Sequence, residues 1–230
     1  TLDPADVRSL APSQVLATMK VVFSNGVTVG YLLALTALSA SFTAWIALSE
    51  PVIVGIYGLE TAFPYLFGGL AFTMAIASLG NSRVVERIGA RRLVHIVVRV
   101  YVVATAAWLV ATIAFGGVTP LWMLVAAMAV VLMSQAFLQS NAQSLAMDPM
   151  GHVAGIASAV IGAVSLGVGT VLGAVVQFFF DDMSLLPIVA SFLLSGLAAM
   201  GFAAWAESRR DDALPASRTS QPRHLVAGRR

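Results

Sequence analysis

Six long apolar stretches follow one another along this chain, separated by short polar gaps. Crossing a hydrocarbon layer of ~30 Å takes about 20 residues at 1.5 Å each. Every stretch reaches roughly that length, so we predict an all-α integral membrane protein with six transmembrane helices. The expected spans are near Val22–Leu48, Ala62–Gly80, Leu93–Phe115, Leu121–Asn141, Val153–Phe180 and Ser184–Ala206.

The basic residues are distributed unevenly among the gaps, and this distribution predicts the orientation. All 13 Lys and Arg residues lie before the first stretch, around the second gap or after the sixth. Cytoplasmic loops collect Lys and Arg. We therefore expect both termini of this multi-pass protein to face the cytoplasm, with residues 1–21 as a linker, 22–206 as the bundle and 207–230 as a disordered tail.

Composition excludes several other classes of function. Charged residues make up only 10% of the chain and its net charge is +2, against roughly 25% charged residues in soluble domains. One-sided basic residues fit contact with lipid headgroups, so we expect the bilayer as a partner and no nucleic acid. With no cysteine and no mid-membrane His beside the nearest serine-protease match at Ser195, we expect no enzyme activity, metal or cofactor.

Uncharged polar and aromatic residues line one direction of the first and fourth stretches. Amides and hydroxyls in hydrocarbon need a partner, and such stripes would suit an amphiphilic, drug-like ligand. Hydrogen bonding between helices, worth about 0.6 kcal/mol per bond, explains them equally well. The cavity candidates are Thr28, Tyr31, Ser39 and Phe42 in the first stretch and Met128, Gln135 and Gln139 in the fourth.

Two further motifs could take part in a conformational change. Gly155, Gly162, Gly169 and Gly173 share one face of the fifth stretch, which permits close helix packing, either static or sliding. In the second gap, Gly89 is expected to make the turn between two helices. Glu86 could pair there with three neighbouring bases and act as a switch, or the gap could be an ordinary basic loop; the bases are Arg87, Arg91 and Arg92.

The second gap resembles the cytoplasmic signature of the major facilitator superfamily, a Gly, a spacer and Asp-Arg-x-Gly-Arg-Arg. Glu86 stands for the Asp, and Ala90 departs from the first Arg of the final pair. Other segments are similar to Bcr/CflA-type drug:proton antiporters in that superfamily. These segments are Thr1–Pro4, Ser49–Pro51 with Tyr57–Leu59, Phe63 and Phe67, then Ser140–Ala142 and Ala154–Ala159.

The resemblance implies the C-terminal half of such a transporter, helices seven to twelve, as one six-helix half-bundle. In that family two halves rock about a cavity lined mainly by the first and fourth helices of each half. The expected partners are the missing N-terminal half, a small-molecule substrate and protons, in a bacterial inner membrane. Two alternatives remain open: a stand-alone six-helix scaffold, and a major facilitator transporter for a sugar or metabolite.

Overall fold

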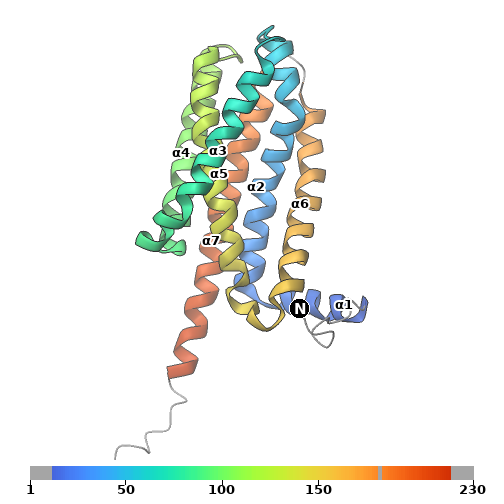
Figure 1. Ribbon diagram of the computed structural model, residues 1–230, viewed down its shortest axis with the longest axis vertical. Helices are drawn as coiled ribbons and strands as arrows, with labels where there is room; N and C mark the ends of the chain where they lie inside the picture. The colour runs from blue at the N-terminus through green and yellow to red at the C-terminus, as the bar shows by residue number, and fades with distance from the viewer. Residues whose placement is uncertain (1–11, 181–182, 219–230) are drawn as a thin grey trace, which may run out of the picture.

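The computed structural model describes residues 12–180 and 183–218, and within these ranges it contains helices and no strand (Figure 1). Six helical segments are long and apolar enough to cross a membrane, so the all-α, six-span fold is confirmed. The elements are α1 (Pro12–Ser24), α2 (Gly26–Glu50), η2 (Pro51–Ile56), α3 (Phe63–Ile88), α4 (Ala90–Ala114), α5 (Leu121–Met147), η3 (Asp148–Val153), α6 (Ala154–Phe178) and α7 (Leu186–Arg218).

Several helices run beyond the apolar stretches that predicted them. The first span continues to Ile56 through the π-helical turn η2, which begins at Pro51. At its other end, the Asn25 side chain accepts hydrogen bonds from the backbone of Val27 and Thr28. Likewise α3 passes Gly80 and ends only at Gly89.

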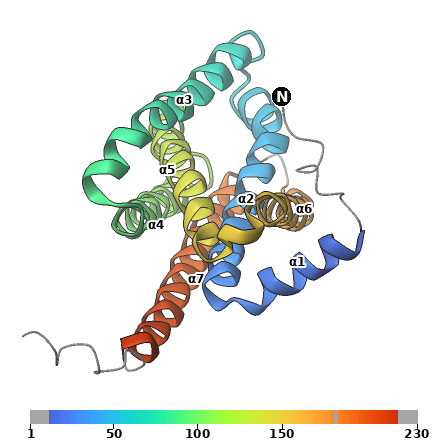
Figure 2. The same ribbon diagram turned by 60° about the horizontal axis from the view of Figure 1, so that its bottom comes forward.

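The segments outside the six spans are more ordered than the sequence indicated. Part of the expected linker forms α1, which lies across one end of the bundle (Figure 2). The prediction of disorder from Glu207 onward is wrong as far as Arg218, because α7 continues to that residue and both Glu207 and Arg210 form ion pairs with other elements. Residues 1–11 and 219–230 lie outside the described residues.

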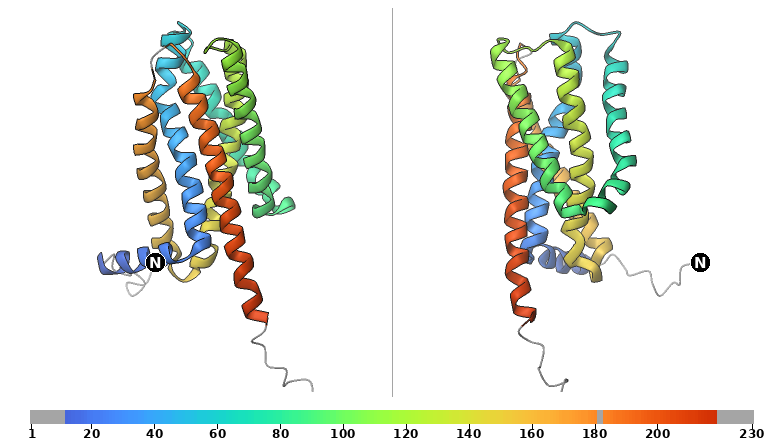
Figure 3. Two further views of the ribbon diagram at one scale, coloured as in Figure 1. Left: turned by 180° about the vertical axis from the view of Figure 1, so that it is seen from behind. Right: turned by 90° about the vertical axis from the view of Figure 1, so that its left-hand side faces the viewer.

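The helices are not packed equally around the bundle (Figure 3). Helix α2 lies at the centre and packs against α5, α6 and α7, whereas α3 packs mainly on α5. In the most apolar part of each helix, 61% of α2 residues are buried against only 11% of α3 residues. The bundle therefore has a closed side around α2, α4 and α7 and leaves α3 largely uncovered.

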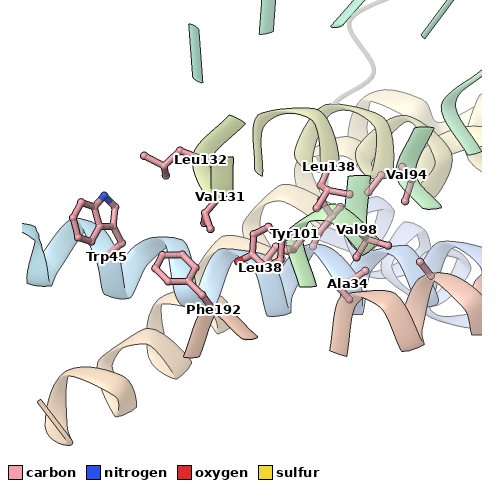
Figure 4. Close-up of a cluster of buried hydrophobic side chains, with 14 of the residues drawn as sticks. Ala34, Leu38, Trp45, Val94, Val98, Tyr101, Val131, Leu132, Leu138 and Phe192 are labelled. Atoms are coloured by element: carbon pink, nitrogen blue, oxygen red, sulfur yellow. The ribbon is translucent and has the colours of Figure 1, made fainter. Parts of the chain in front are cut away.

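Small residues allow the closed side to pack tightly. A Cβ added at Gly30 of α2 would lie 2.6 Å from Cβ of Ala206 on α7. A Cβ at Gly196 of α7 would lie 2.6 Å from the Tyr101 ring on α4. Tyr101 and Phe192 lie beside Leu38 in the buried core (Figure 4). Helix α7 therefore comes within backbone distance of α2 at Gly30 and packs closely against the Tyr101 side chain of α4 at Gly196.

A buried trio of hydroxyls also joins these three helices. The Ser195 Oγ of α7 donates to the Ser41 Oγ of α2 at 2.8 Å. The Tyr101 hydroxyl of α4 lies 3.2 Å from Ser195 Oγ and 3.4 Å from Ser41 Oγ. These groups satisfy one another in an apolar core, so the serine noted in the sequence for its resemblance to a protease motif has a packing role here.

Candidate functional site

The polar stripe of α5 divides between the core and the surface. Met128 is fully buried, Gln135 is 3% exposed and Gln139 is exposed. The Gln135 amide nitrogen donates to the backbone oxygen of Leu38 on α2 at 2.9 Å. Its Oε1 is buried without a hydrogen-bond partner among the described residues. Gln135 thus joins α5 to α2 and keeps one polar atom for a water or a ligand.

The stripe of α2 meets different neighbours at different heights. The Thr28 hydroxyl donates to Asn25 Oδ1 at 3.3 Å, and the fully buried Tyr31 donates to Glu207 on α7 at 2.6 Å. Ser39 packs against Gly169 of α6. Helices that cross at an angle diverge along their length, so one face of α2 does not form one continuous ligand surface.

Phe42 has a different environment, in a shallow concavity between α2, α3 and α5. This concavity has a volume of about 80 Å³ and is almost wholly apolar. Ligand pockets usually enclose ≈ 300–1,000 Å³, so the concavity is too small to hold a drug-sized molecule by itself. It forms one apolar wall beside the uncovered helix α3; its lining is Phe42, Trp45, Ile46, Phe67, Leu70, Ala71, Met74 and Leu132.

A charge cluster lies at the end of the bundle where α1 and the Gly89 turn are found, which we call the basic end. Glu207 of α7 lies at its centre, with its side chain 16% exposed. Arg91 Nε of α4 lies 3.5 Å from Glu207 Oε2, and Arg210 Nε lies 3.8 Å from Oε1. Arg210 also contacts Asp148 of η3 at 2.9 Å. With Tyr31, the cluster connects α2, α4, α7 and η3.

This geometry corrects the predicted pairing in the second gap. Among the described side chains, Glu86 forms no salt bridge with Arg87, Arg91 or Arg92, and the acid that contacts Arg91 is Glu207. Glu86 and Arg87 lie on the last turns of α3, before the turn, and are exposed. Gly89 makes the expected turn, with φ 82°, a conformation that glycine adopts without steric strain.

The glycine face of α6 is occupied along only half of its length. A Cβ at Gly169 would lie 2.6 Å from Ser39 Cβ, and one at Gly173 would lie 2.8 Å from the Ala40 backbone oxygen. At Gly155 and Gly162, the same addition would meet no atom of the described residues within 4 Å. Gly169 and Gly173 pack on α2, whereas Gly155 and Gly162 leave a surface of small residues open.

The sequence alone did not predict the acids and hydroxyls that connect distant helices. Glu207 and Asp148 lie outside the six apolar stretches, and Tyr101 lies within the third. The signal for Glu207 was an acid directly after the sixth apolar stretch and close to two arginines. Within the described residues, no group of three or more His, Asp or Glu could hold a metal ion.

A comparison with known proteins finds one similar to this chain. A segment of 148 residues is 28% identical to a protein named bicyclomycin resistance protein homolog from Haemophilus influenzae. The match covers 64% of this chain and 36% of that relative, so the chain corresponds to well under two thirds of the relative's length. No family model and no solved structure matches the chain. The similarity supports a multi-pass membrane protein of the transporter type.

Proposed function

We propose that this chain is the C-terminal half of a major facilitator drug:proton antiporter of the Bcr/CflA type. The observation that carries the proposal is the uncovered side of the bundle. Helix α3 packs on α5 but is buried over only 11% of its most apolar part, and α6 presents Gly155 and Gly162 without a neighbour among the described residues. A second six-helix bundle placed against α3 and α6 would cover both surfaces.

The proposed substrate site lies between this half and its partner. The apolar concavity around Phe42 provides one wall, and Gln135 with its unpartnered Oε1 and the exposed Gln139 provide polar groups nearby on α5. An apolar wall with few hydrogen-bonding groups suits an amphiphilic, uncharged or weakly charged compound. Tyr31, Thr28 and Ser39 are not assigned to this proposed site, because Tyr31 bonds to Glu207, Thr28 bonds to Asn25 and Ser39 packs against Gly169.

Proton coupling is assigned to the second bundle. The acids in the described spans are the exposed Glu50, Glu86 and Asp148, and Glu207, which is committed to Tyr31 and two arginines at the basic end. A coupling carboxylate must exchange protons within the transport path. We therefore place it in the partner half, and we place the basic end in the cytoplasm of a bacterial inner membrane by the positive-inside rule.

Drug export by the native full-length protein tests this function. Cells that produce it are expected to accumulate less bicyclomycin than cells without it, and a proton ionophore should abolish the difference. Bicyclomycin is the first compound to try because the relative is named for resistance to it. Unchanged accumulation and no proton flux across a panel of amphiphilic drugs would favour a stand-alone scaffold. Uptake of a sugar or metabolite would favour a major facilitator transporter for that compound.

A further inference from the structure

A row of three depressions follows the seam between α2 and α7, away from the concavity around Phe42. The first, about 430 Å³, lies at the basic end and is lined by residues that include Phe23, Asn25, Trp205 and Arg209. The second, about 500 Å³, is lined by Leu33, Ala198, Gly201, Phe202 and Trp205. Because Trp205 lines both, the two depressions are continuous.

The third depression extends the same row toward the far end. It measures about 430 Å³, is almost wholly apolar, and lies between α6 and α7 with Ala37 and Ala40 of α2 in its lining. Ala198 lines both the second and the third depression. The row therefore has one polar end, at Arg209, followed by a long apolar groove.

Arg209 is held in place at the polar end without an acid partner among the described side chains. Its guanidinium carbon lies 5.4 Å from the centre of the Trp205 ring. Its aliphatic stem crosses the first residue of α2, where a Cβ on Gly26 would lie 3.1 Å from Arg209 Cγ. The neighbouring Arg210 instead contacts Asp148 and Glu207. Arg209 therefore offers a positioned positive charge that no acid among the described side chains neutralises.

The first two depressions together have the length of one lipid leaflet. From Arg209 to Ala198, α7 rises about 16 Å at 1.5 Å per residue. Half of a ~30 Å hydrocarbon layer is about 15 Å. The first two depressions thus match one leaflet, and the third continues the row beyond it.

Helix α1 places further lipid-binding groups at the same level. It lies across the basic end (Figure 2) and keeps Val22 buried, while Leu16 and Phe23 are 66% and 49% exposed. Lys20 is exposed as well. Exposed apolar residues and a cation on one short helix are typical of a segment that lies in the membrane interface.

We propose that the α2–α7 groove binds an anionic phospholipid, with its phosphate beside Arg209 and one acyl chain along Leu33, Gly201 and Ala198. Charge complementarity selects the lipid, since no described acid pairs with Arg209 and the cytoplasmic leaflet is rich in anionic headgroups. The inference rests on the proposed cytoplasmic placement of the basic end. The site is separate from the proposed substrate site, because it shares none of its lining residues with the concavity around Phe42.

Native mass spectrometry of the purified full-length protein tests the proposal with phosphatidylglycerol and with phosphatidylcholine of the same chains. Arg209→Gln should weaken phosphatidylglycerol binding about fivefold, the effect of ~1 kcal/mol per basic residue. Arg92→Gln removes the same charge from an exposed site at the same end and should leave binding unchanged. Equal losses in both variants, or equal binding of both lipids by the unaltered protein, would overturn the proposal.

A second pair of variants tests the acyl chain without changing charge. A Cβ at Gly201 would meet no described atom within 4 Å, so Gly201→Leu should fold and fill the groove, lowering retention of both lipids. Ala198→Leu blocks the next position and serves if Gly201→Leu is poorly folded by circular dichroism. Unchanged retention in a folded groove variant, or displacement of phosphatidylglycerol by glycerol phosphate, would mean that the site takes a soluble anion instead.

Discussion

The two sides of this six-helix bundle differ in how they are held together. On the closed side, α2, α4 and α7 meet at Gly30 and Gly196 and share the Ser41, Tyr101 and Ser195 hydroxyls. On the other side, α3 is mostly exposed. The N-terminal half of α6, with Gly155 and Gly162, has no neighbour along its glycine face in the described chain. Both sides are apolar, so the difference lies in contact with small residues. Small residues that another helix covers form the tightly packed core. Small residues that remain exposed mark a candidate surface for a partner.

The largest expected loss of stability comes from a bulky side chain on the half of the α6 glycine face that packs against α2. Gly169→Leu would force atoms into Ser39 Cβ and the Ala40 backbone nitrogen, which lie 2.6 and 3.1 Å from an added Cβ. Overpacking costs about 3 kcal/mol in such a site, so the melting temperature in detergent should fall sharply. Gly162→Leu, on the open half, should keep its melting temperature and reduce drug export by the full-length protein. Equal destabilisation by the two variants would contradict the division of the face.

A smaller loss of stability is expected at the charge cluster of the basic end. Glu207→Gln leaves Arg91 without its acid and Arg210 with Asp148 alone. We expect a loss of about 1–2 kcal/mol, reduced by solvent screening because the Arg91 side chain is 47% exposed. Glu86→Gln is the matched control: it alters an exposed acid and should change stability by less than about 0.5 kcal/mol. Chemical unfolding of the two variants in detergent decides whether Glu207 or Glu86 is the structural acid.

The hydroxyl trio on the closed side should contribute less than the charges. Tyr101→Phe removes one member and keeps the 2.8 Å bond between Ser195 and Ser41. Hydrogen bonds between membrane helices average about 0.6 kcal/mol, so the shift in unfolding free energy should be near that value. Ser195→Ala removes the contacts of Ser195 with both Ser41 and Tyr101, including the 2.8 Å bond, and should destabilise more. A larger effect of Tyr101→Phe would show that the tyrosine contributes more than its hydroxyl bonds.

The smallest effect on folding is expected at Gln135, between the two sides. Gln135→Leu loses the bond to the Leu38 backbone oxygen but also removes a buried oxygen without a partner, and these changes nearly cancel. Under the proposed function, export of a hydrogen-bonding drug should fall about tenfold, the result of losing ~1.4 kcal/mol. Drug accumulation measured at matched protein levels checks this. Normal export by Gln135→Leu would remove Gln135 from the proposed site.

The amino-acid sequence was sufficient to predict the six helices, because hydrophobic length is a local property. The turn at Gly89 could be predicted for the same reason. The charge cluster could not, since Tyr31 and Glu207 are 176 residues apart and meet only where α7 crosses α2 beside Gly30. A helical wheel also treats α2 as if one neighbour ran along its whole face. In the structure that face meets α7 at Tyr31, α6 at Ser39 and the concavity at Phe42.

The turn at Gly89 couples the position of α3 tightly to that of α4. It is a single residue between two long helices, so it provides no slack. Helix α3 is about 39 Å long at 1.5 Å per residue, and a tilt of 10° would displace its far end by about 7 Å. A partner that tilts the uncovered α3 would therefore move the start of α4 through Gly89. Arg91, which contacts Glu207 of α7, lies two residues beyond this turn.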